Sequence, residues 1–448
     1  MKIKTIKEGF DFIESFTNFE KRQPGSIREY RPERMSYLLD YFNFPEKSFR
    51  KVHVAGSKGK GSTAVFISSI LSSAGYKTGL YTSPHVSSYK ERISLAGSMI
   101  DDLIFLDFIN RISLNIKNFI FRPTTFELLT LLSFLIFQSL KCDWAVIETG
   151  IGGRLDATNV IEPDICVLCP VEIEHRNLLG DSLESIASEK AGIIKKNIPV
   201  FSSRQTGIVK STFLDKAEKA GTEIYFIEDI VDVIKTKISL PVMKIKILKK
   251  DKNNFSRIST SMIGQHQGEN AGLAAVVCEY ILNSIPPPSP AAGAIKRYIR
   301  LGIKKAFLPG RLEILQTKPY IILDAAHTPS SINRIIGVMK SLFSDNIILI
   351  LGIIQGKEIE KISEVLSGNV QRIIVSTPGK FKKSNPMDVY KIVRKMHPLT
   401  ELELLPRDAL KRALSCSNGK KPILVAGSFY MISEIRSLIK NTPAVSLP

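Results

Sequence analysis

A glycine-rich turn around residue 60 has the composition of a phosphate-binding loop. Residues 54–62 read VAGSKGKGS and lie between an apolar strand-like run and a helical pattern that opens at Ser62. In such a turn, glycines let backbone N–H groups curl around anionic oxygens, a lysine adds positive charge, and a hydroxyl at the helix N-terminus can reach a magnesium ion. The residues of this turn are Gly56, Ser57, Lys58, Gly59, Lys60, Gly61 and Ser62.

The spacing of the turn departs from the general phosphate-loop pattern. That pattern has four residues between its first glycine and the Gly-Lys pair, which Ser or Thr follows directly. Here two residues separate Gly56 from Gly59, and Gly61 lies between Lys60 and Ser62. The sequence therefore favours nucleotide binding but leaves open a plain strand-to-helix turn.

A second candidate site follows an apolar run that ends in an acid. Residues 147–159 read IETGIGGRLDATN, so Glu148 closes a strand-like segment and glycines follow it. Parallel sheets present their chemistry at the carboxyl ends of their strands. Because magnesium prefers a few hard oxygen ligands together with water and phosphate, Glu148 is a candidate magnesium ligand. The alternative is an ion pair between Glu148 and Arg154.

A third candidate is a lysine on the apolar face of a helix. Residues 172–180 read EIEHRNLLG and lead into a helix for which Asp181 and Glu184 are expected to form a capping box. Lys190 then shares one face of this helix with Leu183, Ile186, Ala187 and Ile194. A lysine in this position either extends along the helix to reach solvent or is turned into a site. Both interpretations stay open at this point.

Strand-like and helical patterns alternate along the chain from residue 51 onward. This alternation predicts a largely parallel sheet covered by helices, the α/β class. In the first part of the chain the expected strands are residues 51–55, 144–148, 165–169 and 198–202, and the expected helices are residues 62–74 and 124–140. In the second part the expected strands are residues 320–324, 347–351, 372–376 and 422–426.

The length of the chain predicts two domains. A chain of 448 residues is too long for one core, since domains usually contain roughly 100–200 residues. We expect residues 1–304 to form an N-terminal nucleotide-binding domain and residues 305–448 a smaller C-terminal α/β domain. The competing boundary is the proline-rich segment 286–290, but a helix expected from Ala291 could still close the first domain.

The charge of the chain invites a nucleic-acid interpretation. The formal net charge is +19, and lysines crowd residues 235–252 and 296–305. Regularly interleaved aromatic residues are missing from these stretches, so solvated surface charge is the preferred interpretation. Some of the excess charge could help to gather anionic substrates.

Neither a membrane protein nor a disulfide framework is expected. The N-terminal residues show no signal-peptide pattern, and the most apolar segment, residues 128–137, is shorter than the roughly 20 residues that span a bilayer. Five cysteines in a 44% hydrophobic chain point to a reducing cytoplasm. Cys166 and Cys169 are expected to be buried strand positions rather than a metal or redox pair.

Together with other motifs in the same order, these segments resemble the folylpolyglutamate synthase and dihydrofolate synthase branch of the Mur ligase superfamily. That family typically carries motifs close to GTNGKGS, TSPH, ER, GGRLDATN, DH, LGD, EKAGI, HQ, NA, PGR and DGAHNP. This chain carries GSKGKGS at 56–62, TSPH at 82–85, ER at 91–92, GGRLDATN at 152–159, EH at 174–175, LGD at 179–181, EKAGI at 189–193, HQ at 266–267, NA at 270–271, PGR at 309–311 and DAAHTP at 324–329.

The resemblance implies an ATP-dependent amide ligase. ATP would phosphorylate a carboxylate of folate or dihydropteroate, and the amino group of L-glutamate would attack the acyl phosphate to give an amide, ADP and phosphate. A carboxylate is a poor electrophile, so such a site must neutralise charge and exclude water from the acyl phosphate. The implied fold is a mostly parallel sheet similar to that of phosphate-loop NTPases, with helices on both faces, and a smaller Rossmann-like C-terminal domain.

The resemblance also implies roles for individual residues. Lys60 would clamp the ATP phosphates, and the catalytic set would be Lys60, His175 and Lys190. Two magnesium ions would be placed by Ser62, Ser83, Glu148, His175 and Lys190. Lys190 would act as a carbamylated lysine, in which carbon dioxide converts a neutral amine into a carboxylate-like ligand. The nucleotide would also be held by Asn270, Arg311, Asp324 and His327. The implied partners are small molecules only, without nucleic acid or membrane, and the implied state is a monomer.

Four departures from the family pattern bear on substrate detail and rate more than on reaction class. Lys58 replaces an Asn of the phosphate loop and adds a cation near the phosphates. Glu174 replaces the usual Asp, and the carboxylate on its longer side chain is expected to steer the following histidine. The other departures are Ala325 and Thr328 in the DGAHNP motif, and residues 355–358, QGKE, where the family often has a Lys-Asp pair.

Two other functions stay open at this stage. A Mur ligase of peptidoglycan precursor synthesis would share the phosphate loop and its chemistry, although GGRLDATN and PGR favour the folate branch. A non-catalytic nucleotide-binding or nucleic-acid-binding protein would need neither Lys190 nor His175. Within the folate branch, the sequence leaves open addition of the first glutamate to dihydropteroate, extension of folates, or both.

Overall fold

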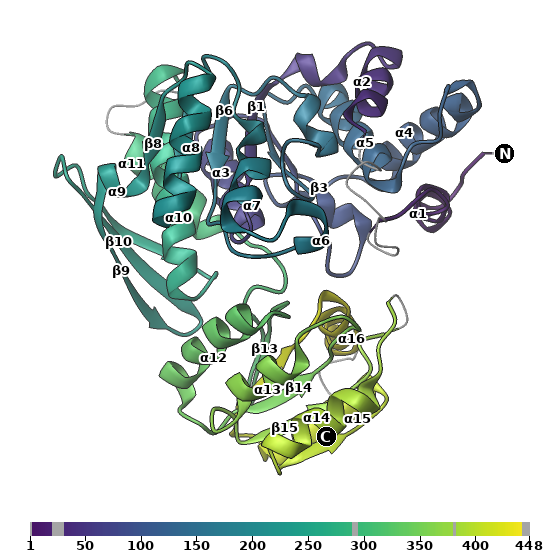
Figure 1. The fold of residues 1–448 in the computed structure, drawn as a ribbon, viewed down its shortest axis with the longest axis vertical. Helices are drawn as coiled ribbons and strands as arrows, with labels where there is room; N and C mark the ends of the chain where they lie inside the picture. The colour runs from purple at the N-terminus through teal and green to yellow at the C-terminus, as the bar shows by residue number, and fades with distance from the viewer. Residues whose placement is uncertain (1, 20–30, 289–293, 380–381, 441–448) are drawn as a thin grey trace. The chain divides into compact units, whose positions relative to one another are not determined.

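The computed structural model describes residues 2–19, 31–288, 294–379 and 382–440, which form two compact units (Figure 1). The first unit comprises Met1–His85, Tyr89–Thr260 and His266–Phe307, and the second comprises Val86–Ser88, Ser261–Gln265 and Leu308–Pro448. The boundary expected between residues 304 and 305 stays a prediction. The competing boundary at residues 286–290 and the helix start at Ala291 lie wholly or partly outside the described residues.

An eight-stranded sheet with β1 near its middle forms the centre of the first unit. Its strand order is β4-β3-β2-β5-β1-β6-β7-β8. The strands are β1 (Arg50–Ala55), β2 (Thr78–Tyr81), β3 (Ile93–Leu95), β4 (Ser98–Met99), β5 (Trp144–Glu148), β6 (Ile165–Leu168), β7 (Val200–Ser202) and β8 (Ile224–Phe226). β1 pairs in parallel with β5 and β6, so that Val52 lies opposite Val146 on one side and Ile165 on the other. β3 pairs antiparallel with both β2 and β4, so it alone runs opposite to the other strands of this sheet.

The connections of this sheet place a topological switch point at the carboxyl end of β1. After β1 the chain first builds β2 to β5 on one side of that strand, and then β6 to β8 on the other. In open α/β sheets, ligands bind at such a switch point, beyond the carboxyl ends of the strands. The glycine-rich turn begins directly after Ala55, the last residue of β1.

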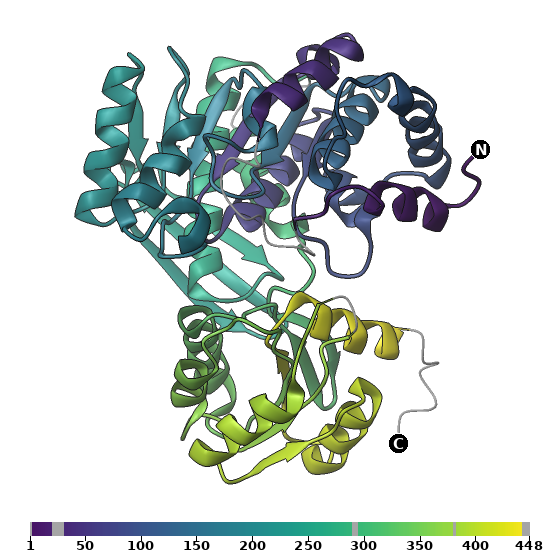
Figure 2. The same ribbon diagram turned by 45° about the vertical axis from the view of Figure 1, so that its right-hand side comes forward.

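Helices cover both faces of this sheet (Figure 2). On one face lies α3 (Lys60–Ser73), against which α10 (Gln265–Ser284) and α11 (Ala294–Lys305) pack. The other face is covered by α1 (Ile6–Glu14), α2 (Pro32–Tyr41), α4 (Asp102–Asn115), α5 (Thr125–Ser139), α7 (Leu183–Lys190) and α8 (Gly207–Lys219). α5 is apolar on all sides and buried, as expected for a helix inside a core. Two short helices, α6 (Arg176–Leu179) and α9 (Ile227–Ile230), lie in connections.

A three-stranded antiparallel sheet in the first unit was not expected from the sequence. It consists of β9 (Val231–Ser239), β10 (Val242–Lys249) and β11 (Phe255–Thr260), in the order β11-β10-β9. The lysine-rich stretch 235–252, interpreted only as surface charge, forms most of it. In β10 the buried residues Met243, Ile245 and Ile247 alternate with exposed lysines. This period of two is the pattern of a half-buried strand, and it was present in the sequence.

The second unit contains a six-stranded sheet with the order β12-β13-β17-β14-β15-β16. The strands are β12 (Glu313–Thr317), β13 (Tyr320–Leu323), β14 (Ile348–Leu351), β15 (Arg372–Val375), β16 (Thr400–Leu402) and β17 (Ile423–Ala426). All pairs are parallel except that of β12 with β13. The helices are α12 (Pro329–Phe343), α13 (Ile359–Leu366), α14 (Pro386–Met396), α15 (Pro406–Ser417) and α16 (Phe429–Lys440), of which α15 and α16 pack on the core face of the strands.

The predicted fold class is confirmed, with two local corrections. A parallel-rich sheet in the first unit and a second α/β unit agree with the expected architecture. The helix after the glycine-rich turn begins at Lys60 rather than Ser62, because the left-handed Gly59 serves as its N-cap. The capping box expected from Asp181 and Glu184 is wrong: Ser182 caps α7, and Ser185 completes the box.

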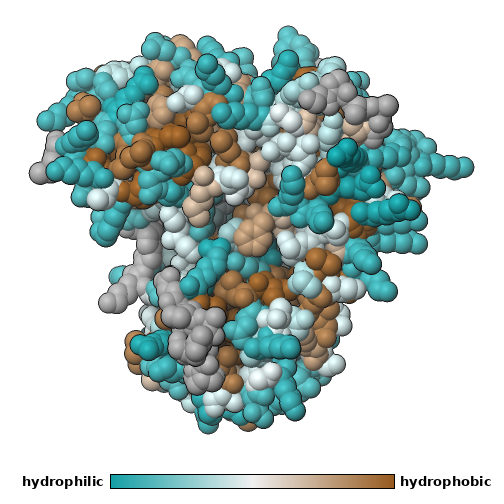
Figure 3. All heavy atoms as spheres, turned by 180° about the vertical axis from the view of Figure 1, so that it is seen from behind, coloured by the Kyte–Doolittle hydropathy of each residue, from teal (hydrophilic) through white to brown (hydrophobic). Residues whose placement is uncertain are grey.

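The surface agrees with the interpretation of the lysine-rich stretches as solvated charge. On the face drawn in Figure 3, hydrophilic side chains are spread widely, with hydrophobic groups between them. In α11 the buried residues include Ile299 and Ile303, whereas the lysines of this helix lie on its accessible side. No described helix combines the length and apolar character needed to cross a membrane.

Candidate active site

The glycine-rich turn connects β1 to α3 at the switch point of the first sheet. Gly59 has a φ of 81°, and a Cβ at this position would lie 2.5 Å from Oδ1 of Asn270. Glycine is therefore required here, both for the left-handed backbone and for the close approach of Asn270. The first N–H groups of a helix have no partners within that helix, so the start of α3 at Lys60 offers an anion-binding position.

The first half of the turn is tied to the segment after β6. The backbone N–H groups of Ser57 and Lys58 donate to the carbonyl oxygen of Pro170 at 2.8 and 3.2 Å. The hydroxyl of Ser57 donates to the carbonyl oxygen of Glu172 at 2.9 Å. These bonds fix the turn from Gly56 to Lys58 against the segment that follows β6.

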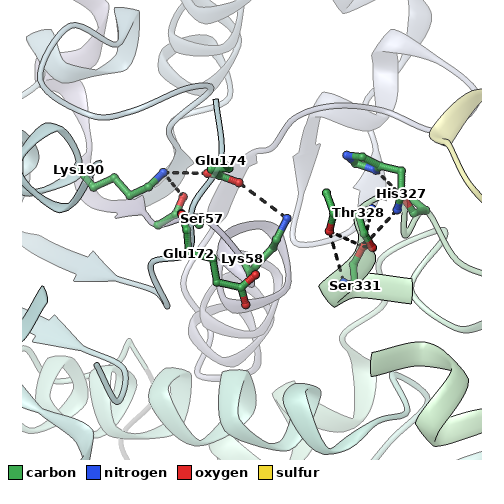
Figure 4. A network of polar contacts seen from close by, with 10 residues as sticks. Ser57, Lys58, Glu172, Glu174, Lys190, His327, Thr328 and Ser331 are labelled. Carbon is green, nitrogen blue, oxygen red and sulfur yellow. Dashed lines mark hydrogen bonds and ion pairs between the residues drawn. The ribbon is translucent and has the colours of Figure 1, made fainter. Parts of the chain in front are cut away.

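Lys190 lies inside the protein, beside this turn. Its side chain is about 1% exposed, and its Nζ donates to the carbonyl oxygen of Gly56 at 2.9 Å and to Oε1 of Glu174 at 3.0 Å (Figure 4). The interpretation in which Lys190 extends to solvent is therefore wrong. Burial lowers the pKa of Lys190 to about 8, although the nearby Glu174 carboxylate opposes this change.

Glu174 links two lysines, one from the turn and one from α7. Lys58 places its Nζ 3.8 Å from Oε2 of Glu174, while Lys190 binds the other carboxylate oxygen (Figure 4). Burial alone would raise the pKa of Glu174, but the surrounding cations, Lys190 first among them, lower it to about 2. Glu174 was expected to steer the following histidine. That role stays a prediction. The contacts show that Glu174 pairs with two lysines, so that two departures from the family pattern meet in one ion-pair network.

Glu148 and Ser83 lie together at the carboxyl edge of the same sheet. Glu148 ends β5 opposite Val54 of β1, is buried, and accepts a hydrogen bond from the backbone N–H of Ser83 at 3.0 Å. The alternative pairing of Glu148 with Arg154 is not formed, because Arg154 binds Glu189 through two nitrogens at 3.0 and 2.8 Å.

The remaining candidates of the first unit lie on the elements around the turn. Ser62 is buried in the first turn of α3, and His175 has a left-handed backbone with a φ of 47° at the start of α6. His175 is close enough to Glu174 for its charge to lower the pKa of that carboxyl. In the described part of the chain, no group of three or more His, Cys, Asp and Glu side chains is arranged as a metal site.

A buried hydrogen-bond chain that the sequence analysis missed supports the loop after Glu148. Asp156 accepts hydrogen bonds from the N–H of Ile151 at 2.9 Å and from the N–H and hydroxyl of Thr158 at 3.0 and 2.6 Å. Because the Thr158 hydroxyl donates its proton to Asp156, its oxygen acts as the acceptor in the second hydrogen bond. The donor is Nε2 of His53, at 2.8 Å. Asp156 and Thr158 belong to the GGRLDATN motif, and this motif was the available signal for their importance.

Cys166 and Cys169 are buried at the end of β6, as expected for strand positions. Burial raises the pKa of each thiol to about 12, which disfavours the thiolate needed for redox or metal chemistry. The Cys169 thiol lies 3.5 Å from the hydroxyl of Thr63 on α3. The pair therefore belongs to the core beneath the glycine-rich turn.

The second unit gathers its own candidates at the carboxyl ends of β13 and β17. Asp324 is buried and accepts hydrogen bonds from the N–H groups of Leu312 at 2.9 Å and Ala326 at 2.8 Å. Burial raises the pKa of Asp324, and the Arg311 guanidinium opposes that change. The guanidinium lies 5.0 Å from the ring centroid of Phe429, a residue the sequence analysis missed.

His327 and Thr328 complete this edge of the second sheet. Nδ1 of His327 lies 2.8 Å from the carbonyl oxygen of Ala325, and its ring centroid is 6.4 Å from that of Phe429. Thr328 forms the N-cap of α12 in a capping box with Ser331 (Figure 4). Thr328, although it departs from the family motif, therefore still caps α12 well.

Comparisons with known proteins agree with this arrangement. The model of the Mur ligase middle domain matches residues 54–278, and that of the Mur ligase glutamate ligase domain matches residues 310–429. A dihydrofolate synthase/folylpolyglutamate synthase of Bacillus subtilis is 32% identical over 414 residues, which cover 91% of this chain and 94% of that protein.

Solved structures show the same fold. The folylpolyglutamate synthase of Mycobacterium tuberculosis complexed with ADP and AMPPCP has a TM-score of 0.83 at 25% identity, covering 92% of this chain and 96% of that chain. An FPGS–AMPPCP–folate complex has a TM-score of 0.82 at 28% identity, covering 97% and 100%. By its two domain matches and its full-length relative, this chain belongs to the folylpolyglutamate synthase and dihydrofolate synthase family of Mur ligases.

Proposed function

We propose that this protein is an ATP-dependent ligase that adds L-glutamate to a carboxylate of folate or dihydropteroate through an acyl phosphate. The observation that carries the proposal is the phosphate loop at the switch point of the first sheet, with Lys60 at the start of α3 and buried Lys190 bound to the carbonyl of Gly56. The bound ATP analogue and folate of the structural relative support the same substrates.

In the proposed reaction, Lys60 and the N-terminal N–H groups of α3 bind the phosphates of ATP. They stabilise the negative charge that develops as the γ-phosphoryl group moves to the substrate carboxylate. The amino group of L-glutamate then attacks the carbonyl carbon of the acyl phosphate, and phosphate leaves as the amide forms. Gly59 and Asn270 keep the start of α3 in place, since the side chain of Asn270 lies against Gly59.

Magnesium fits the oxygen donors beside the loop. Buried Glu148 supplies a carboxylate next to Ser83, and Ser62 supplies a hydroxyl in the first turn of α3. One carboxylate with hydroxyl, phosphate and water oxygens is a donor set that magnesium accepts. A bound ion would supply charge neutralisation on the phosphates. We propose Ser62, Ser83 and Glu148 as ligands of the first ion.

A second ion would depend on the chemical state of Lys190. As an ammonium group Lys190 donates to Gly56 and Glu174 and has no lone pair for a metal. Carbamylation would convert it into an oxygen ligand, and we propose this group and His175 as ligands of the second ion. The lowered pKa of Lys190, about 8 through burial, supports this proposal because carbon dioxide reacts with the neutral amine.

Residues of the second unit complete the proposal. We propose that Arg311, Asp324 and His327 bind the nucleotide, with Phe429 as the platform that holds the Arg311 guanidinium flat. The same proposal includes the predicted boundary between residues 304 and 305, a cytoplasmic location and a monomeric state. The five free cysteines, of which four are buried and Cys416 is partly exposed, support the location.

The decisive experiment assays the purified chain with ATP, magnesium and L-glutamate, using dihydropteroate and tetrahydrofolate in parallel as acceptors. Acceptor-dependent release of ADP with a new glutamyl product supports the proposal, and the two acceptors separate addition of the first glutamate from chain extension. ADP release that depends on muramyl peptides instead would favour a peptidoglycan ligase.

A further inference from the structure

Four lysines form a compact cationic surface on the sheet of β9 to β11. Lys235 of β9 lies directly opposite Lys246 of β10, and Lys237 lies directly opposite Lys244. All four side chains are exposed. Residues opposite each other in antiparallel strands have Cβ atoms about 5 Å apart, and like charges in such pairs destabilise a sheet. We call Lys235, Lys237, Lys244 and Lys246 the lysine quartet.

The charge of the quartet is not balanced within its sheet. The three strands contain one acidic residue, Asp232, and in the described part of the chain none of the four lysines forms an ion pair with a carboxylate. Nearby Lys249 shows the contrast, because it is buried and lies 2.8 Å from Glu279 and 3.1 Å from Asp251. Two adjacent like-charge pairs without local compensation are a feature that an anionic partner would stabilise.

Within the first unit, α10 lies between the sheet that carries the quartet and the phosphate loop. The opposite face of β9 packs against α10, where a Cβ on Gly268 would lie 2.5 Å from Thr236 and one on Gly272 would lie 2.3 Å from Ile234 (Figure 1). The same turn of α10 carries Asn270, whose side chain lies against Gly59. One helix and one sheet layer therefore separate the quartet from the loop, a distance of roughly 20 Å.

The residue types and the lysine spacing of this surface favour one kind of anionic partner over others. The only aromatic residue of the three strands, Phe255, is buried, so these strands offer no aromatic platform on which nucleobases could stack. Lysines two apart on a strand are about 6.7 Å apart. Standard bond lengths give about 6 Å for the repeat of an extended γ-linked glutamate chain, which carries one α-carboxylate per unit. The lysine spacing thus fits successive carboxylates of such a chain.

We propose that the lysine quartet is a docking surface for the oligo-γ-glutamyl tail of the folate substrate. This inference rests on the proposed function, since a ligase that extends folates produces such tails. A single glutamate cannot extend from the phosphate loop to the quartet, whereas a chain of several units covers the distance. The quartet therefore favours acceptors that already carry several glutamates.

The test replaces the quartet in the full-length chain with Lys235→Gln, Lys237→Gln, Lys244→Gln and Lys246→Gln together. The control variant carries Lys391→Gln, Lys395→Gln, Lys411→Gln and Lys420→Gln, four exposed lysines of the second unit, so both variants lose the same charge. Steady-state rates are measured with tetrahydrofolate carrying one or five glutamates. Binding of a γ-linked pentaglutamate peptide is measured separately by calorimetry at low and high salt.

We expect the quartet variant to raise the KM for the pentaglutamate acceptor about tenfold, since each of four exposed ion pairs adds a modest increment. kcat and the KM for the monoglutamate acceptor stay unchanged, and the control variant behaves as wild type. The peptide binds wild type, and binding falls with salt and in the quartet variant. Removing two like-charge pairs leaves the melting temperature equal or higher.

Three results would overturn the inference. The first is an unchanged KM for the pentaglutamate acceptor in the quartet variant. The second is an equal effect in the control variant, which would indicate total charge rather than this surface. The third is quartet-dependent binding of a single-stranded RNA oligonucleotide without binding of the peptide. Peptide binding needs no ligase activity, so a failure of the proposed function remains distinguishable from a failure of the docking surface.

Discussion

The Nζ atom of Lys190 lies 3.0 Å from Oε1 of Glu174, and the same ammonium group donates to the carbonyl oxygen of Gly56 at 2.9 Å. One buried cation thus connects the first residue of the phosphate loop to the residue that precedes His175. A change in the charge of Lys190 would alter the hydrogen bonds of the loop itself. The state of this lysine and the geometry of the phosphate site are therefore coupled.

The first prediction concerns pH and carbon dioxide. With the pKa of Lys190 lowered to about 8, the neutral amine fraction rises as pH increases through 8 and is about a tenth at pH 7, against roughly 0.03% for an ordinary lysine. At limiting bicarbonate, ligase activity should increase from pH 7 to 8.5, and added bicarbonate should raise it. Lys190→Ala should lose activity and recover part of it with formate or acetate.

The matched control for this prediction is Lys219→Ala, which removes an exposed lysine of α8. It should show the wild-type response to bicarbonate and none to formate. An intact mass or density map of the active enzyme with unmodified Lys190 would refute carbamylation, and activity that does not respond to bicarbonate would also count against it.

The second prediction is that Lys60→Ala abolishes ligation while the protein stays folded. Lys60 is the first residue of α3 and is only partly buried, so its removal opens no cavity in the core. Loss of one preorganised cation at the phosphates should reduce kcat by a factor of about 100 to 1000, or ~3–4 kcal/mol. Circular dichroism and thermal melting provide the folding control, and turnover close to wild type would contradict the phosphate-loop assignment.

Local sequence patterns predicted the parts of the fold that periodicity determines. Alternating apolar runs located β1, β5, β13 and β17 to within about two residues. The antiparallel sheet was missed because its lysines were interpreted as charge, although Met243, Ile245 and Ile247 alternate with them as in a half-buried strand.

The site contacts that the sequence did not predict join segments that are far apart in the chain. Lys58 meets Glu174 across more than a hundred residues, and no local rule places them together. The same holds for His53 with Thr158. Phe429 follows β17 and reaches Arg311 only because β17 lies beside β13 in the sheet. Such pairs depend on strand order, which a single sequence does not specify.

The third prediction separates the two lysines that bind Glu174. Glu174→Gln leaves the ammonium of buried Lys190 without its carboxylate, so the free energy of unfolding should fall by about 3 kcal/mol. Lys58→Gln should cost less than about 1 kcal/mol, because Lys58 is partly exposed and lies 3.8 Å from the carboxylate. Urea unfolding at pH 7 measures both, and equal losses would contradict this ranking.

The fourth prediction concerns the nucleotide role proposed for Arg311. Arg311→Ala removes the guanidinium that lies over Phe429 and should raise the KM for ATP about tenfold. Arg311→Lys should restore little, because a lysine keeps the charge but loses the planar group. The control is Arg412→Ala, which removes an arginine bound to Glu401. An unchanged KM for ATP in Arg311→Ala would remove this residue from the site.

The fifth prediction uses the buried histidine beneath the loop that follows Glu148. His53 is fully buried, and burial lowers its pKa from 6.5 to about 3. Between these values the unfolded chain holds a proton that the folded chain lacks, so stability falls as pH drops below 6.5. At pH 5 this difference amounts to about 2 kcal/mol. His53→Leu should therefore flatten the dependence of stability on pH between 5 and 7.

Thr158→Val separates protonation from hydrogen bonding in this test. It removes the hydroxyl that accepts from Nε2 of His53 and donates to Asp156, but it keeps the titrating ring. This variant should be less stable at every pH and should keep a slope at least as steep as that of wild type. If wild type and His53→Leu showed parallel curves of unfolding free energy against pH, the buried neutral histidine would not be the source of acid sensitivity.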